Sequence, residues 1–62
     1  MTTQLVYRGE IKPNVFVMCT LRNKWYQVQL QRAGSVKYES TTEPSRAVEI
    51  MKQYIEEAKN DQ

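Results

Sequence analysis

Histidine is absent from the sequence, cysteine occurs once, and glycine occurs twice among 62 residues. Histidine is the commonest general base and a frequent metal ligand, so its absence removes both roles together. One cysteine and scattered carboxylates do not form the spaced ligand sets that bind zinc. The two glycines, at positions 9 and 34, lie too far apart to build a loop that holds phosphate groups. We therefore expect no enzymatic activity, no bound metal and no cofactor.

The single cysteine, Cys19, has no second thiol with which to form a disulfide within the chain, and this fits a reducing compartment. Its place inside an apolar stretch predicts a small core side chain rather than a reactive thiol. That stretch, residues 15–19, is the longest apolar run and is far shorter than the ~20 residues that span a bilayer. The N-terminus also lacks the basic lead and apolar segment of a signal peptide. We expect a cytoplasmic protein that does not enter a membrane.

The length predicts one small domain over residues 1–62. A chain of this size buries only about 60% of the surface that its unfolded form exposes, so one helix on one small sheet is about the largest core it can build. One face of such a sheet stays uncovered and must meet water or a partner.

Alternating and β-branched segments, separated by turn residues, predict four strands. The second and third are joined by a short polar link that contains Asn23, which is typical of a β-hairpin. Pro13 and Gly34 mark the other turns, because proline cannot donate to a strand ladder and glycine readily adopts positive φ. Such short links favour antiparallel neighbours, since parallel strands need crossovers of a dozen or more residues. The predicted strands are residues 4–10, 15–21, 24–32 and 36–40.

The pattern of residues 43–59 predicts an amphipathic helix. Thr41 or Thr42 can cap its first turn, and Pro44 fits there because its missing N–H would have no partner at that position. The apolar side chains of this segment recur three and four residues apart, as a stripe on one side of a helix does. They are Ala47, Val48, Met51, Tyr54, Ile55 and Ala58.

This pattern predicts an α+β fold in which a four-stranded antiparallel β-meander, or a three-stranded one, carries the C-terminal helix on one face. The second strand is apolar on both faces, so a one-residue slip would exchange them and its orientation stays open. The face expected beneath the helix holds Leu5, Tyr7, Val15, Val17, Cys19, Leu21, Tyr26, Val28, Leu30, Val36 and Tyr38. The face expected to stay uncovered holds Val6, Arg8, Phe16, Met18, Thr20, Trp25, Gln27, Gln29, Gln31, Lys37 and Glu39.

The uncovered face is the candidate binding site. Phe16, Met18 and Trp25 would form an apolar patch there, and such patches commonly mark interaction sites. A weakly charged apolar face suits a protein partner, either a second copy of the chain or a larger protein that takes it as an accessory or inhibitory subunit. The net charge of +2 favours this hypothesis, since nucleic-acid-binding domains carry a stronger basic excess. The candidate binding residues are Arg8, Phe16, Met18, Arg22, Lys24, Trp25, Gln27, Gln29, Gln31 and Lys37.

Nucleic-acid binding is the alternative hypothesis. Trp25 could stack on bases, the three glutamines could hydrogen-bond to base edges, and the flanking Arg and Lys side chains could contact phosphates. Residues 1–42 hold six cationic and two acidic side chains, against three and five in residues 43–62. That asymmetry could steer an anionic partner to the sheet. The same residues are also common on ordinary surfaces, where they would have structural roles or meet only water.

Lys24-Trp25 opens the third predicted strand, and residues 42–47 form a threonine-capped, alanine-containing start of the helix. In this order of elements the chain resembles the plant ethylene-response domains and the arm-binding domains of phage integrases. The resemblance extends over about residues 24–58 and implies a sheet that binds DNA with a helix behind it. The chain differs from both families in having few arginines on the sheet and an additional apolar strand.

Overall fold

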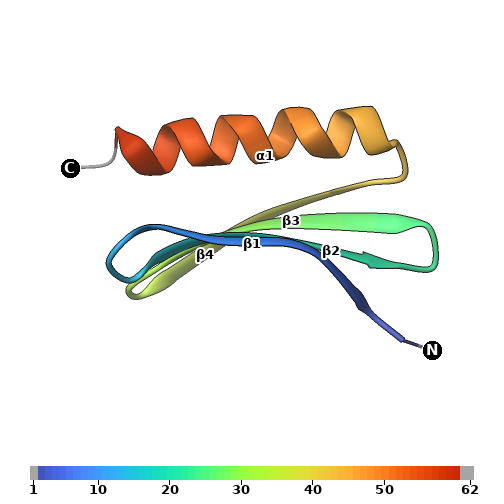
Figure 1. Cartoon of the computed structure of the whole chain (residues 1–62), viewed down its shortest axis with the longest axis horizontal. Helices are drawn as coiled ribbons and strands as arrows, with labels where there is room; N and C mark the ends of the chain where they lie inside the picture. Colours follow the sequence, from blue (N-terminus) through green and yellow to red (C-terminus); the bar gives the residue numbers. More distant parts are fainter. Residues whose placement is uncertain (1, 61–62) are drawn as a thin grey trace.

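The computed structural model describes residues 2–60, and in this part of the chain four antiparallel strands form a sheet that lies beneath one helix (Figure 1). The strands are β1 (Gln4–Lys12), β2 (Val15–Arg22), β3 (Trp25–Arg32) and β4 (Ser35–Thr41), in the order β1-β2-β3-β4 across the sheet. The helix α1 (Pro44–Lys59) follows β4 and packs on one face. The predicted α+β fold is therefore confirmed in its four-stranded form. Within residues 2–60, no helix has the length and hydrophobicity needed to cross a membrane.

Two-residue links join the strands, and residues in the left-handed backbone conformation make these links possible. Asn23 and Lys24 have φ angles of 51° and 67°, the pair of conformations that defines a type I′ turn. Asn14, with φ 66°, and Gly34, with φ 83°, are the left-handed residues of the other two links. Because Lys24 belongs to the turn, β3 begins at Trp25 rather than at position 24. Short turns of this kind fix the register of the strands on both sides.

The core lies between α1 and the two central strands. Val17 is opposite Leu30, and Cys19 is opposite Val28, so these four side chains share the face beneath the helix. The orientation of β2, which the sequence left open, is therefore settled. Cys19 is buried, as predicted. The buried apolar side chains are Val17, Cys19, Val28, Leu30, Ala47, Ile50, Tyr54 and Ala58.

The start of α1 differs from the prediction. The helix begins at Pro44, and the residue before it, Glu43, makes no side-chain cap hydrogen bond. The Thr41 hydroxyl instead accepts a hydrogen bond from the N–H of Glu43 at 3.2 Å, ahead of the helix. The predicted cap by Thr41 or Thr42 is thus wrong, because a helix that begins at Pro44 makes Glu43 the cap residue and leaves both threonines ahead of it.

The apolar stripe of α1 is rotated from the predicted one. Ile50, which the predicted stripe omitted, is fully buried, whereas Val48 is 45% exposed. The row that meets the sheet runs through positions 47, 50, 54 and 58, at spacings of three and four residues. Both rows satisfy helical spacing, and only the contact with the sheet decides between them.

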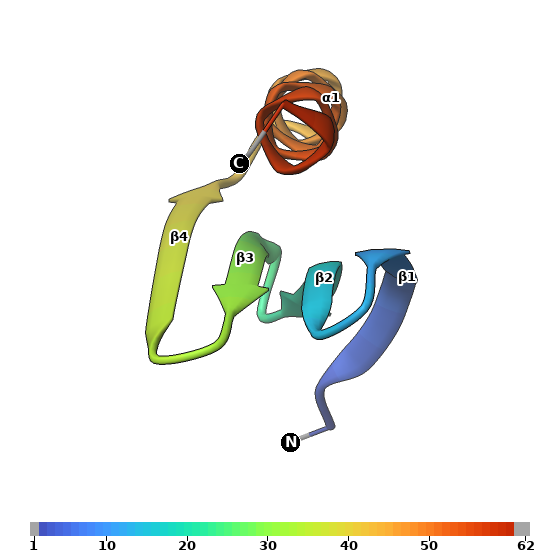
Figure 2. The same cartoon turned by 90° about the vertical axis from the view of Figure 1, so that its left-hand side faces the viewer.

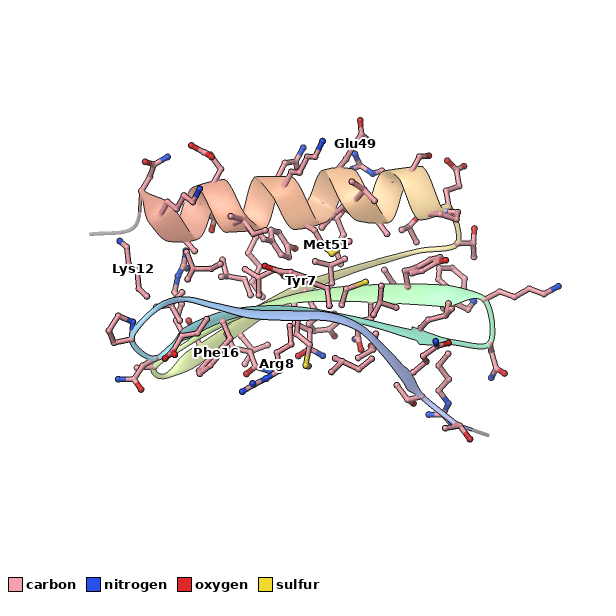
Figure 3. The ribbon with its side chains drawn as sticks, in the orientation of Figure 1. Tyr7, Arg8, Lys12, Phe16, Glu49 and Met51 are labelled. Atoms are coloured by element: carbon pink, nitrogen blue, oxygen red, sulfur yellow. The ribbon has the colours of Figure 1, made fainter. Side chains whose placement is uncertain are left out.

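β1 continues to position 12 rather than 10 and contains two register shifts, at residues 5–7 and 10–12. The first shift moves Leu5 onto the side away from the helix, where the sequence did not place it. Tyr7 keeps its predicted side and points toward α1 (Figure 3). An added Cβ on Gly9 would meet the Tyr7 hydroxyl oxygen at 2.5 Å, so this glycine leaves room for the tyrosine ring.

The orientation of β4 is the reverse of the prediction. Residues that pair directly across two strands share a face, and Leu30 is opposite Lys37. Lys37 and Glu39 therefore lie on the helix side, and the assignment of Lys37 to the uncovered face is wrong. Val36 and Tyr38 lie on the uncovered side, where they are 59% and 62% exposed.

The charged side chains of β4 on the helix side form ion pairs with α1. Lys37 Nζ lies 2.9 Å from Glu57 Oε1 and 5.3 Å from the centre of the Tyr54 ring. Arg46 Nη2 lies 3.3 Å from Glu39 Oε2. The helix packs more extensively on β3 and β2 than on β4, so these side chains sit at the rim and keep their charged ends near water.

Candidate functional site

In residues 2–60, no element covers the side of the sheet turned away from α1 (Figure 2). We call this side the open face. Arg8 and Phe16 point away from the helix on this side (Figure 3). All four strands contribute to it. Its side chains are Leu5, Arg8 and Glu10 from β1, Phe16, Met18, Thr20 and Arg22 from β2, Trp25, Gln27, Gln29 and Gln31 from β3, and Val36, Tyr38 and Ser40 from β4.

Large apolar side chains are spread across the open face. Phe16 and Met18 are half-buried on β2, in the interior of the sheet. Toward the two edges and the β2–β3 turn, the apolar side chains are more than half exposed. These are Leu5 at 56%, Trp25 at 53%, Val36 at 59% and Tyr38 at 62%. So many exposed large apolar side chains on one side of a small sheet are unusual on a surface that meets only water.

The three glutamines of β3 form a row of hydrogen bonds along the middle of the open face. Gln31 Nε2 donates to Gln29 Oε1 at 2.9 Å, and Gln29 Nε2 donates to Gln27 Oε1 at 3.4 Å. Their side chains are half-buried, opposite Phe16, Met18 and Thr20 of β2. The two bonds align the amides along the strand, so a bound partner would meet a line of donors and acceptors beside an apolar strand.

Arg8 is held against the open face by an aromatic ring. Its guanidinium carbon lies 4.8 Å from the centre of the Phe16 ring, which is a cation–π distance. Glu10 pairs directly with Phe16 from the same strand as Arg8. This end of the face therefore combines one cation, one carboxylate and one aromatic ring.

A hollow of about 380 Å³ lies at the other end of the open face, beside the β2–β3 turn. Trp25 and Arg22, which pair directly, form part of its wall. Its remaining lining is polar and comes from three strands, the segment before β1 and the turn. The lining residues are Thr3, Thr20, Arg22, Asn23, Trp25, Gln27 and Ser40. A planar or extended group could rest on the indole there and accept hydrogen bonds from the guanidinium.

The cations of the sheet are divided between its two sides. Arg32 and Lys37 lie on the helix side and donate to the Glu57 carboxylate at 3.0 Å and 2.9 Å. The hydrogen bond from Lys37, and after it the one from Arg32, holds the pKa of Glu57 below its usual value. The same bond raises the pKa of Lys37. Among residues 2–60, the open face keeps only Arg8 and Arg22 as cations, with Lys24 in the adjoining turn.

The structure brings nine of the ten candidate binding residues to the open face or to the turn beside it, and Lys37 is the exception. Leu5, Val36 and Tyr38 also lie on the open face, where the sequence pattern did not place them. For β4 the signal was present in the sequence: a two-residue link at positions 33–34 makes Leu30 pair with Lys37, whatever the polarity of the side chains. For Leu5 no such signal existed, because the register shift beside it leaves no simple sequence mark.

Within the described range 2–60, no group of three or more His, Cys, Asp or Glu side chains is arranged to hold a metal ion. The chain matches no protein-family model, and comparisons with curated proteins and with solved structures give no significant match. The open face is therefore the feature of the molecule from which a function can be inferred.

Proposed function

We propose that this protein is a noncatalytic interaction module that binds a partner protein through its open face. One observation carries the proposal: Leu5, Phe16, Met18, Trp25, Val36 and Tyr38 lie on one side of the sheet, and no element of the described chain covers them. Aromatic residues, Met and Arg are enriched at protein interfaces, and this face contains all three kinds.

The dimensions of the face suit a compact interface. Four strands about 4.8 Å apart and about eight residues long, at ~3.3 Å per residue, give an area of roughly 500 Å². A standard interface buries about 800 Å² on each partner, so this face lies toward the small end of specific contacts. We expect moderate affinity, with Trp25 and Tyr38 as the side chains whose removal weakens binding most.

Charge indicates which partner fits. Arg8, Arg22 and the adjoining Lys24 outnumber Glu10, so the face and its rim carry a small positive excess. A second copy packed face to face would present the same positive excess, and the two like charges would repel. A different protein with an apolar centre and an acidic rim would be complementary in both respects.

Nucleic acid is the second candidate, and the hollow beside Trp25 favours it. An exposed indole next to Arg22 and Gln27 offers a stacking surface, a phosphate contact and a base-edge contact together. The position of Lys37 on the helix side argues against this candidate, because it removes a cation from the proposed phosphate-binding surface. Two arginines and one lysine provide little of the counterion release on which such affinity depends.

The experiment compares the parent chain with Trp25→Ala and with Val48→Ala, a control that shortens a similarly exposed apolar side chain on the helix. Each is immobilised and exposed to nuclease-treated extract of its native cell, and the retained proteins are identified. We expect a protein that the parent and Val48→Ala retain and that Trp25→Ala loses. The purified pair should bind with an affinity that weakens only modestly between low and physiological salt.

Retention of the same proteins by Trp25→Ala would contradict the proposed surface. The nucleic-acid candidate is examined separately, by fluorescence anisotropy with labelled single-stranded and double-stranded oligonucleotides. Binding that depends on Trp25 and falls steeply with rising salt would replace the protein-binding proposal. Both variants should remain folded and melt only slightly below the parent, because each side chain is about half exposed.

A further inference from the structure

The two edges of the sheet are built differently. β1 is interrupted by two register shifts, which is a common way to protect an edge strand from pairing with another chain. β4 pairs with β3 in unbroken register from Ser35 to Thr41 and contains neither proline nor glycine. Its outer edge is therefore a regular template of backbone donors and acceptors.

The register of β4 shows which backbone groups point outward. The two-residue link makes Arg32 and Ser35 the ends of a β-turn, whose closing pair is of the hydrogen-bonded type. Antiparallel ladders alternate, so the N–H and C=O groups of every second residue point toward β3 and the rest point away. The outward set on this strand is Val36, Tyr38 and Ser40.

The side chains of β4 are self-complementary about Tyr38. In an antiparallel pair of two β4 strands centred there, Tyr38 meets its own copy and Val36 meets Ser40 of the second chain. Lys37 then lies opposite Glu39 of the second chain, and Glu39 lies opposite its Lys37. Both charges are on the helix side of the sheet, at positions where opposed side chains come closest.

We infer that two copies of this chain pair edge to edge through β4, antiparallel and centred on Tyr38, to form one continuous eight-stranded sheet. Charged residues on an edge strand usually discourage pairing. Here they select a register instead. Centring the contact on Lys37 or on Glu39 would place like charges opposite each other, whereas centring it on Tyr38 forms two opposite-charge pairs and uses all the outward backbone groups.

Neither charge is saturated by its contacts within the chain. The Lys37 ammonium has three donors, of which one is directed to Glu57. Glu39 accepts from Arg46 through Oε2, which leaves its other oxygen available to the second chain. The cross-strand pairs would therefore extend the existing ion pairs at the rim of the helix.

The position of α1 leaves the β4 edge accessible. The helix packs mainly on β3 and β2 and does not extend beyond β4 (Figure 2). A two-fold axis perpendicular to the sheet would place both helices on one side and join the two open faces on the other. The contact uses the backbone edge of β4 and brings only the open-face side chains of that strand against the second chain, so it does not require the proposed function to hold.

The test uses Lys37→Glu and Glu39→Lys, each alone and mixed in equal amounts. The first chain has only acidic residues at these two positions and the second only basic ones, so each repels itself and complements the other. We expect the parent to show concentration-dependent mass in sedimentation equilibrium between about 10 μM and 1 mM, since one strand pair buries less than a standard interface. Each variant alone should have its dissociation constant raised at least about tenfold, and the mixture should form a heterodimer with near-parental affinity.

Two further variants separate this contact from other causes. Glu57→Gln removes a charge contact within the chain and should leave the dimer intact. Val36→Pro removes an outward N–H without taking a bond from the β3 ladder and should abolish the dimer. Circular dichroism spectra of both variants should match that of the parent, which checks that they are folded.

Amide hydrogen exchange supplies the structural readout. The amides of Val36, Tyr38 and Ser40 should be protected in the parent dimer and unprotected in Val36→Pro, apart from the proline itself. A parent that stays monomeric at the highest concentration would overturn the inference. So would a dimer that persists in Lys37→Glu, or a mixture that fails to associate.

Discussion

Shortening Ile50 should destabilise the fold far more than shortening Val48, two positions away on the same helix. Ile50 is fully buried among the core side chains, whereas Val48 is 45% exposed. Ile→Ala removes three carbons from a closed core and leaves a cavity, at a cost of about 2–5 kcal/mol. Val48→Ala removes two carbons that are already partly in water and should cost less than about 1 kcal/mol.

The size of the domain makes this difference easy to measure. At about 0.05–0.15 kcal/mol per residue, a chain of this length has a stability of roughly 3–9 kcal/mol. Ile50→Ala should therefore remove about half of the free energy of unfolding, or more. Urea denaturation followed by far-ultraviolet circular dichroism is the suitable assay, because Trp25 is 53% exposed and its fluorescence reports poorly on the core.

The comparison has a clear contrary outcome. Equal losses for the two variants, or a larger loss for Val48→Ala, would mean that α1 meets the sheet with the stripe expected from the sequence. The described rotation of the helix would then be wrong. An unchanged slope of unfolding free energy against urea would confirm that both variants act on stability and not on the unfolded state.

Three further predictions concern single groups. Lys37 and Arg32 hold the pKa of Glu57 in the folded protein below its usual value. Their ion pairs with Glu57 therefore stabilise the fold fully when the pH is above the pKa that Glu57 has in the unfolded chain. This stabilisation is lost as the pH falls through the lower pKa of Glu57 in the folded protein. Glu57→Gln should thus flatten the acid side of a stability–pH profile below about pH 4.5 and, for this partly exposed group, cost no more than about 1 kcal/mol at neutral pH. Burial raises the pKa of the Cys19 thiol and shields it from solvent, so a thiol reagent should react with the native protein only as fast as the fold opens. The reaction should be faster in destabilised variants. Lys24→Gly should raise the free energy of unfolding by roughly 0.5 kcal/mol in urea denaturation, because it relieves a left-handed lysine and creates the Asn-Gly pair that type I′ turns favour; a loss of stability would contradict the turn assignment.

The sequence predicted the fold because its local signals agree. Turn residues at Pro13-Asn14, at Asn23 and at Gly34 separate apolar stretches of strand length, and a separate segment has helical spacing. The orientation of β3 also followed, since Val28 and Leu30 alternate with glutamines. In these elements the apolar side is the buried side, so alternation is a sufficient guide.

Most of the candidate site followed from the same alternation, and its errors fall where burial no longer decides orientation. β4 lies at the edge of the sheet, where α1 gives little cover, so placing Val36 and Tyr38 inward would gain little. The two-residue turn at 33–34 then sets the register and carries Lys37 and Glu39 to the helix side, where α1 supplies counter-charges. At this edge the geometry of the turn, and not the hydrophobic pattern, decides which side chains of β4 face the helix. The same geometry gives the open face two of its apolar side chains and gives the edge its self-complementary charges, so the strand that the pattern misassigned contributes to both proposed contacts.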